Sequence, residues 1–170
     1  METTASETGG WLQLVLLGVF LIIAILFLLT EQNTLRTIKN ENRRIRPGQV
    51  WLQMIPIFGQ IWQFIVVVRI AGSIRNEVAS WENDSILGIE AAAIAQGNKR
   101  PTQAIGIAYC TLIVIGVGLN PVLWGNPKVP IGLIELIGWT ELAGIICWIV
   151  YWVKLAGYKR RLRQKNLATL

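Results

Sequence analysis

The sequence predicts an all-α integral membrane protein with three transmembrane helices and one interrupted, re-entrant segment that enters and leaves the membrane on the same side. Three observations lead to this prediction. Apolar stretches of about 20 residues recur, which is the length that crosses roughly 30 Å of hydrocarbon. Hydrophobic residues make up 53% of the chain and charged residues only 15%, against roughly 25% in soluble domains. Lysine and arginine gather beside the apolar stretches, as they do in cytoplasmic flanks.

The chain is expected to form a single membrane domain, residues 1–170. Its first span is 11–29, which carries no charge and begins with Trp11 as an interfacial anchor. Apolar positions beyond this span keep a helical spacing, so the helix is expected to extend into the cytoplasm as far as residue 46. Pro47 then ends it, because the residue before a proline is pushed out of the helical region.

The segment 49–70 is apolar enough to enter a bilayer, but Pro56 and Gly59 interrupt it near the middle. The proline breaks the helical hydrogen-bond ladder, and the glycine is expected to allow the chain to reverse direction. Irregular backbone at membrane depth needs polar partners. Three glutamines within the segment are expected to supply them: Gln53, Gln60 and Gln63. After the break, a helix is expected to run from near Ile57 to about residue 81.

Four elements are expected in the remainder of the chain. Residues 85–97 form a short amphipathic helix, which either lies on the membrane surface or packs on neighbouring helices. The ranges 102–123 and 131–153 are long apolar stretches and are the two remaining spans. Small residues recur four apart within the first of them, a spacing that favours close helix contact. The tail, 154–170, is basic and is expected to lie in the cytoplasm.

The positions of the 16 lysines and arginines distinguish two topologies. In a four-helix transmembrane bundle, in which 49–70 crosses as a proline-kinked span, the better orientation leaves six of them outside. If 49–70 instead returns to its own side, all of them except Lys128 lie in the cytoplasm. Because short cytoplasmic flanks are rich in lysine and arginine, the second topology is favoured. It places the N-terminus outside and the C-terminus in the cytoplasm, and the bundle is the alternative.

Two acidic residues in the last span are candidates for a polar pathway or a packing contact. Glu141 lies near the middle of 131–153, where an ionised carboxylate costs a few kcal/mol. It is expected to be protonated, paired or beside a wet cavity, with the glutamines of the interrupted segment among its partners. Both a proton or ion relay and an inter-helix hydrogen bond are open. Glu135 lies about 9 Å away along the axis and roughly 120° around the helix, so the two carboxyl groups do not form a close pair.

The basic clusters are expected to contact anionic lipid headgroups rather than nucleic acid. The residues concerned are Arg43, Arg44, Arg46, Lys159, Arg160 and Arg161. The chain contains no histidine, which excludes a zinc site or a triad based on histidine. Cys110 and Cys147 lie within apolar stretches and show no metal or redox spacing. We therefore expect no catalytic residues, no metal, no cofactor and no enzymatic activity.

A motif runs through the interrupted segment and into the helix that follows it. Its residues are Pro47, Val50, Trp51, Leu52, Ile55 and Pro56, then Trp62, Phe64, Ser73 and Glu77. This pattern resembles one found in uncharacterised small bacterial inner-membrane proteins, where Pro-x-x-Val-Trp-Leu-x-x-Ile-Pro precedes Trp-x-Phe and a Ser-x-x-x-Glu helix. The resemblance implies a location in the bacterial inner (plasma) membrane, and it brings no activity or ligand.

These observations favour a non-enzymatic membrane protein with an accessory or scaffold role through helix–helix assembly. Its expected partners are the lipid bilayer, including anionic lipids, and either further copies of the chain or other membrane proteins. The alternative is a small ion or proton channel or transporter, in which the broken segment and Glu141 form a polar path.

Overall fold

A computed structural model describes residues 3–81, 100–124 and 130–168, and this part of the chain is all-helical, without a strand. Two helices are long and apolar enough to cross a membrane, Gly10–Thr37 and Ile131–Leu167. The prediction of an all-α protein is therefore confirmed at this level. The amphipathic helix predicted for 85–97 lies outside the described residues.

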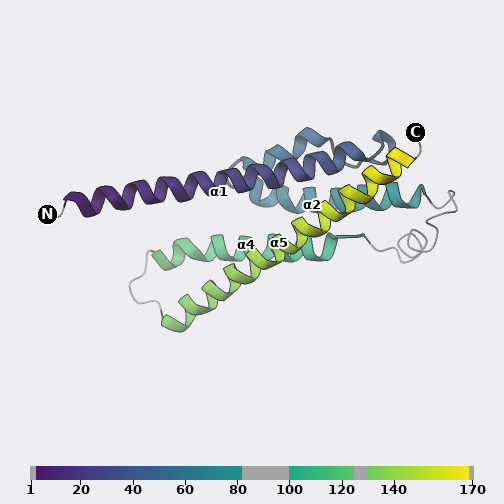
Figure 1. The fold of residues 1–170 in the computed structure, drawn as a ribbon. Helices are drawn as coiled ribbons and strands as arrows, with labels where there is room; N and C mark the ends of the chain where they lie inside the picture. The colour runs from purple at the N-terminus through teal and green to yellow at the C-terminus, as the bar shows by residue number, and fades with distance from the viewer. Residues whose placement is uncertain (1–2, 82–99, 125–129, 169–170) are drawn as a thin grey trace.

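The helices pack side by side as a layered bundle (Figure 1). In chain order they are α1 (Thr3–Thr37), the 3₁₀ helices η1 (Asn40–Asn42) and η2 (Pro47–Met54), α2 (Phe58–Ala79), α4 (Gln103–Trp124) and α5 (Ile131–Ala168). η2 lies against α1, α2 lies against η2 and α4, and α5 packs on both α4 and α1. The N-terminus, the end of α4 and the start of α5 lie toward the same end of the molecule (Figure 1).

The sequence predicted that the first helix extends to residue 46, but this helix ends at Thr37. Contacts with α2 hold the chain in a bent path instead, beginning with Lys39 N, which donates to Glu77 Oε2 at 3.1 Å. Arg43 Nε turns back and donates to the carbonyl of Ile38 at 2.7 Å. A continuous helix would break both contacts, so tertiary hydrogen bonds outweigh the local helical periodicity here.

The interrupted segment forms a hairpin, which we call the central hairpin (residues 44–73). η2 is its first arm, the chain turns at residues 55–57, and α2 forms the second arm. Trp62 Nε1 donates to Gln49 O at 2.8 Å and so joins the two arms. At the base, Arg44 N donates to Ser73 Oγ at 2.8 Å. Both ends of the hairpin therefore lie beside the C-terminal end of α1.

The turn of the central hairpin depends on an isoleucine and a glycine. Ile57, rather than Gly59, adopts a positive φ, at 64°. Gly59 lies in the first turn of α2, where an added Cβ would collide with the backbone carbonyl of Gln53. The glycine is thus required for the close approach of the two arms and not for the reversal that the sequence predicted it would provide.

The basic tail and the last long apolar stretch form one continuous helix, α5, from Ile131 to Ala168. Tyr151, Leu155 and Leu162 are spaced along one face of it and are fully buried. Near its end, Asn166 Nδ2 donates to the carbonyl of Thr37 at 3.0 Å. The tail is therefore packed against the end of α1, a contact that the basic composition of the tail does not indicate.

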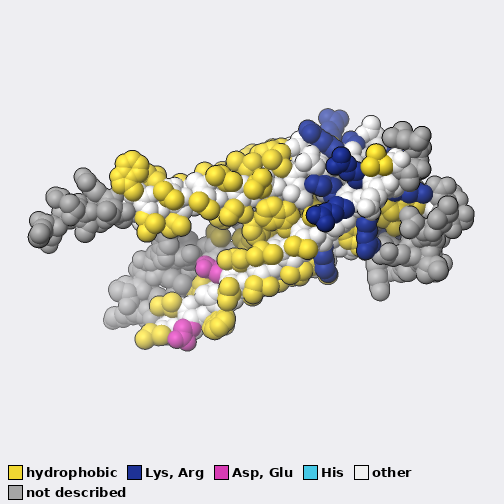
Figure 2. Space-filling view, viewed as in Figure 1, with side chains coloured by type: hydrophobic (Ala, Val, Ile, Leu, Met, Phe, Trp, Pro, Cys, Tyr) yellow, Lys and Arg dark blue, Asp and Glu magenta, His cyan; other side chains and the backbone are white. Residues whose placement is uncertain are grey.

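Burial is uneven along the molecule. No side chain from Trp11 to Leu26 is buried, whereas Phe27 and most apolar residues of the following turns of α1 lie in the core. Figure 2 shows the consequence for the surface. Apolar side chains cover the part of the molecule toward the N-terminus, and lysine and arginine side chains form a band near the opposite end.

The first prediction concerns the turn of the central hairpin. Gly59→Ala should lower the free energy of unfolding by about 1–3 kcal/mol, because its Cβ must displace backbone rather than a flexible side chain. Unfolding of the detergent-solubilised protein measures this change. Gly48→Ala is the matched control, since a Cβ at Gly48 meets no atom within 4 Å. Equal stability of the two variants would contradict the close approach of the arms.

Candidate functional site

Glu31, near the C-terminal end of α1, is a fully buried acidic residue. Gln53 Nε2 donates to its Oε2 at 2.6 Å, and Tyr151 OH donates to its Oε1 at 3.5 Å. Gln53 belongs to the central hairpin and Tyr151 to α5. One carboxyl group therefore joins three elements of the fold, and both of its donors are uncharged.

The residues on either side of Glu31 make similar contacts. Trp152 Nε1 of α5 donates to Thr30 Oγ1 at 3.0 Å. Trp51 Nε1 of η2 donates to Gln32 Oε1 at 3.2 Å. Thus three consecutive residues of α1 bind polar groups from the two elements that flank it. We call these contacts the Glu31 cluster.

An aromatic cluster packs beside the Glu31 cluster, on the side of α4 and α5. The ring of Phe27 lies 5.3 Å from that of Trp148, and the rings of Tyr109 and Tyr151 are 5.2 Å apart. Such offset or tilted pairs add to the stabilisation that burial alone provides. The hydroxyl of Tyr109 is buried and has no hydrogen-bond partner among the described residues. The core next to Glu31 is consequently packed with aromatic rings, but one of its buried hydroxyl groups lacks a hydrogen bond within the described chain.

Glu77 of α2 is a second fully buried acidic residue. Its Oε2 accepts hydrogen bonds from Lys39 N at 3.1 Å and from Asn42 Nδ2 at 2.8 Å. Four residues earlier, Ser73 Oγ accepts from Arg44 N and donates to the carbonyl of Arg69 at 2.8 Å. Ser73 and Glu77 therefore share one face of α2 and hold the loop after α1 against it. Within the described chain, Glu77 Oε1 has no partner.

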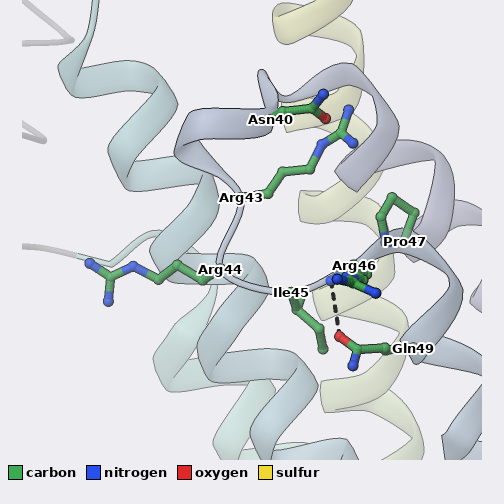
Figure 3. Close-up of a pocket in the computed structure, with 7 residues that line it drawn as sticks. All are labelled: Asn40, Arg43, Arg44, Ile45, Arg46, Pro47 and Gln49. Atoms are coloured by element: carbon green, nitrogen blue, oxygen red, sulfur yellow. Dashed lines mark hydrogen bonds between the residues drawn. The ribbon is translucent and has the colours of Figure 1, made fainter.

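The loop between η1 and η2 contains a pocket of about 430 Å³ (Figure 3). Its lining residues are Asn40, Arg43, Arg44, Ile45, Arg46, Pro47 and Gln49. Arg43 also donates from Nη2 to the carbonyl of Arg36 at 3.0 Å, so its guanidinium binds the end of α1. Arg44 points away from Arg43 and Arg46 in Figure 3, and its side chain lies close to Gly72 of α2. The three guanidinium groups do not converge on one ligand position.

The structure also locates the other residues singled out from the sequence. Gln63 Nε2 donates to Gln60 Oε1 at 3.3 Å, within the first turns of α2. Glu135 and Glu141 are exposed on α5. An added Cβ at Gly116 of α4 would lie 3.0 Å from Glu141 Cγ, so Glu141 packs against that helix.

Among the described residues, no hydrogen bond joins Glu141 to the interrupted segment. Ten residues separate it from Tyr151, the α5 residue beside Glu31 and Gln53, and this spacing corresponds to about 15 Å along the helix axis. The carboxyl group that contacts the interrupted segment is thus that of Glu31. The role of Glu141 itself stays a prediction, as do the lipid contacts of the tail residues Lys159, Arg160 and Arg161.

Sequence reasoning did not select either buried carboxyl group as a site. Glu31 lies two residues beyond the first apolar stretch, 11–29, in a position where a polar flank is expected. For Glu77 a signal existed, because the motif contains Ser73 and Glu77 four residues apart. Val50, another residue of the motif, is also fully buried. Much of the motif therefore marks the contacts that fold the central hairpin onto α1.

Comparison of the chain with protein-family models, with curated proteins and with solved structures found no match. The resemblance of the central motif to small bacterial inner-membrane proteins accordingly stays a prediction. What the protein does is inferred from its own geometry.

The second prediction concerns Glu77. Glu77→Ala should lower the free energy of unfolding by about 2–3 kcal/mol, because it leaves Lys39 N–H and the Asn42 amide without their acceptor. Denaturant unfolding in detergent measures the change. Glu41→Ala, an exposed substitution in the same loop that removes the same charge, should change stability little. A loss of equal size in both variants would instead indicate an effect of net charge.

Proposed function

We propose that the protein is a non-enzymatic membrane scaffold that assembles through a helix it presents within the bilayer. The supporting observation is the uneven burial of α1. Its residues from Trp11 to Leu26 are apolar for the most part and none is buried, whereas the helix from Phe27 onward is packed into the core. A continuous apolar surface of this length is stable in lipid or against another apolar helix, and not in water.

We further propose that three helices cross the membrane and that the central hairpin is re-entrant. The contact between Arg44 and Ser73 at its base supports this topology, because two ends that are tied together lie on the same side. The tip of the hairpin is apolar and open, with Ile57 84% exposed and Ile61 66% exposed. A tip of this kind is suited to lipid. The location we propose is the inner (plasma) membrane of a bacterium, from the resemblance of the central motif. The distribution of lysine and arginine supports an N-terminus outside and a C-terminus in the cytoplasm.

Two close helix approaches limit which small residues remain for assembly. A Cβ at Gly106 would collide with Val67 and come within 3.0 Å of Tyr151, and a Cβ at Gly144 would lie 3.3 Å from Leu112 Cβ. These close approaches are contacts within one chain, so Gly106 and Gly144 are used in folding the protein and not in contacts between chains.

A polar path for ions or protons is less well supported. Such a path was expected to combine the interrupted segment with Glu141, and among the described residues no hydrogen bond joins the two. Glu31, the carboxyl group beside that segment, is fully enclosed by side chains. The scaffold role therefore agrees better with the geometry than transport does.

A labelling experiment tests the topology. Single cysteines replace Glu41, Ser80, Gln164 and Gly132, all exposed, in a protein whose Cys110 and Cys147 are replaced by alanine. We expect a membrane-impermeant thiol reagent to reach the first three positions only from the cytoplasm and Gly132→Cys only from outside. If the cysteines at 41 and 80 react from opposite sides, the hairpin crosses the membrane and the proposed topology is wrong.

Disulfide crosslinking in membranes tests the assembly. Cysteines introduced one at a time over 12–23 of α1 should form crosslinked dimers with a period of three to four residues, as expected for one helix face. Leu142→Cys, on the exposed surface of α5, is the control and should remain uncrosslinked. A monomer that shows no crosslinking at any α1 position would contradict the scaffold role. Ion flux through proteoliposomes containing such a monomer would favour the transport alternative.

A further inference from the structure

A second pocket, of about 410 Å³, lies where α4 begins beside α5. Its lining residues are Arg100, Thr102, Ala104, Ile105, Ala108 and Lys154. The polar members come from the segment just before α4 and from α5, and the apolar members lie along the first turns of α4. None of these residues belongs to the basic clusters that the sequence assigned to anionic lipid. The pocket therefore combines a cationic end with an apolar wall.

The backbone at this pocket offers free donors. The first hydrogen bond of α4 runs from Gly106 N to Thr102 O at 2.9 Å, and Gln103 N donates to Arg100 O at 3.3 Å. The N–H groups of Ala104 and Ile105, in the first turn, have no acceptor among the described residues. Free N–H groups at a helix N-terminus attract anions, because the helix dipole places partial positive charge there.

Thr102 is a second, independent sign of a missing ligand. A threonine that precedes a helix usually caps it, by accepting a hydrogen bond from a first-turn N–H through its hydroxyl. Thr102 is only 9% exposed, yet its Oγ1 is buried without any partner among the described residues. Its φ is 68°, an uncommon value for a β-branched residue. Buried hydroxyl groups are nearly always hydrogen-bonded, so this one calls for an acceptor.

The charges at the pocket point to the class of ligand. Arg100 and Lys154 line it, and among the described residues no acidic side chain does. Lys154 comes directly after the apolar stretch 131–153, and Arg100 lies just before α4. The pocket thus lies at the boundary between apolar and basic surface, which is the level of lipid phosphates in the proposed membrane placement.

We propose that this pocket binds the phosphate group of an anionic phospholipid. Arg100 and Lys154 bind the phosphate oxygens together with the first-turn N–H groups of α4, and Thr102 donates its hydroxyl to the same group. The acyl chains follow the apolar wall formed by Ala104, Ile105 and Ala108. The inference rests on the membrane placement in the proposed function, but it does not require assembly through α1.

A titration with soluble ligands tests the proposal. Full-length protein in an uncharged detergent is mixed with dioctanoyl phosphatidylglycerol, dioctanoyl phosphatidylcholine or inorganic phosphate, and the rise in unfolding temperature gives an apparent affinity. We expect saturable binding of phosphatidylglycerol. Phosphatidylcholine should bind roughly tenfold more weakly, because its choline brings positive charge toward Arg100 and Lys154. Inorganic phosphate should also bind more weakly, since it lacks acyl chains.

Two outcomes of this titration would overturn the proposal. Inorganic phosphate that binds as tightly as phosphatidylglycerol would assign the pocket to a free anion, and no stabilisation by any ligand would leave it without a phosphate site. Because the titration uses detergent-solubilised protein and does not depend on crosslinking, its failure can be distinguished from a failure of the scaffold role.

Charge variants separate a defined site from general attraction. The double variant Arg100→Gln/Lys154→Gln should weaken phosphatidylglycerol binding by roughly tenfold or more, because it removes charge-assisted hydrogen bonds. Arg36→Gln/Arg163→Gln removes the same charge from exposed positions of α1 and α5 and should leave the affinity within about twofold of the wild type. Equal losses in the two double variants would show that binding follows net charge, and the proposal would then be wrong.

Thr102→Val tests the orphan hydroxyl without changing the size of the side chain. The unliganded variant should unfold at the same temperature as the wild type or higher, because a buried group without a partner has been removed. Its affinity for phosphatidylglycerol should fall severalfold. A variant that is less stable but binds the lipid as the wild type does would make the hydroxyl structural and would contradict its role in the site.

Discussion

The hydrogen bonds of the Glu31 carboxyl group determine how the helices of this protein are arranged. In the proposed membrane placement, apolar contacts alone specify the position of a helix poorly, because lipid tails are as apolar as leucine side chains. A carboxyl group bound by Gln53 of the hairpin and Tyr151 of α5 has far fewer acceptable arrangements. The same holds for Trp51 and Trp152, whose indole N–H groups bind the residues next to Glu31. Polar contacts thus select one packing of helices that are otherwise uniformly apolar.

Glu77 has the corresponding role at the base of the central hairpin. With Ser73 it binds backbone and side-chain groups of the loop after α1, and so ties both ends of the hairpin to one place. Arg43 is used in a similar way, because its guanidinium binds two carbonyls near the end of α1. Arg43, one of the basic residues that the sequence analysis assigned to anionic lipid, therefore stabilises the fold. Arg100 and Lys154 differ from it, since they face a pocket that no acidic side chain of the described chain lines.

The two proposals use different ends of the molecule. Assembly depends on the exposed half of α1, where side chains such as Leu16 and Phe20 are 59% and 66% exposed. Lipid binding depends on the start of α4, at the boundary with the basic band. A scaffold that binds an anionic lipid near the cytoplasmic surface would be held at a defined depth while its first helix remains available to a neighbour. Each property is thereby open to a separate measurement.

The sequence by itself determined the helical class, the break at Pro56 and the helix that follows it, because these depend on local periodicity and on residues that disrupt helices. It also located the α5 span, although not its continuation to Ala168. Only the tertiary structure decided that Glu31 rather than Glu141 contacts the hairpin, that α1 ends at Thr37, and that Ile57 takes the left-handed conformation. Each of these depends on hydrogen bonds or close contacts between residues distant in the chain, which local sequence patterns do not encode.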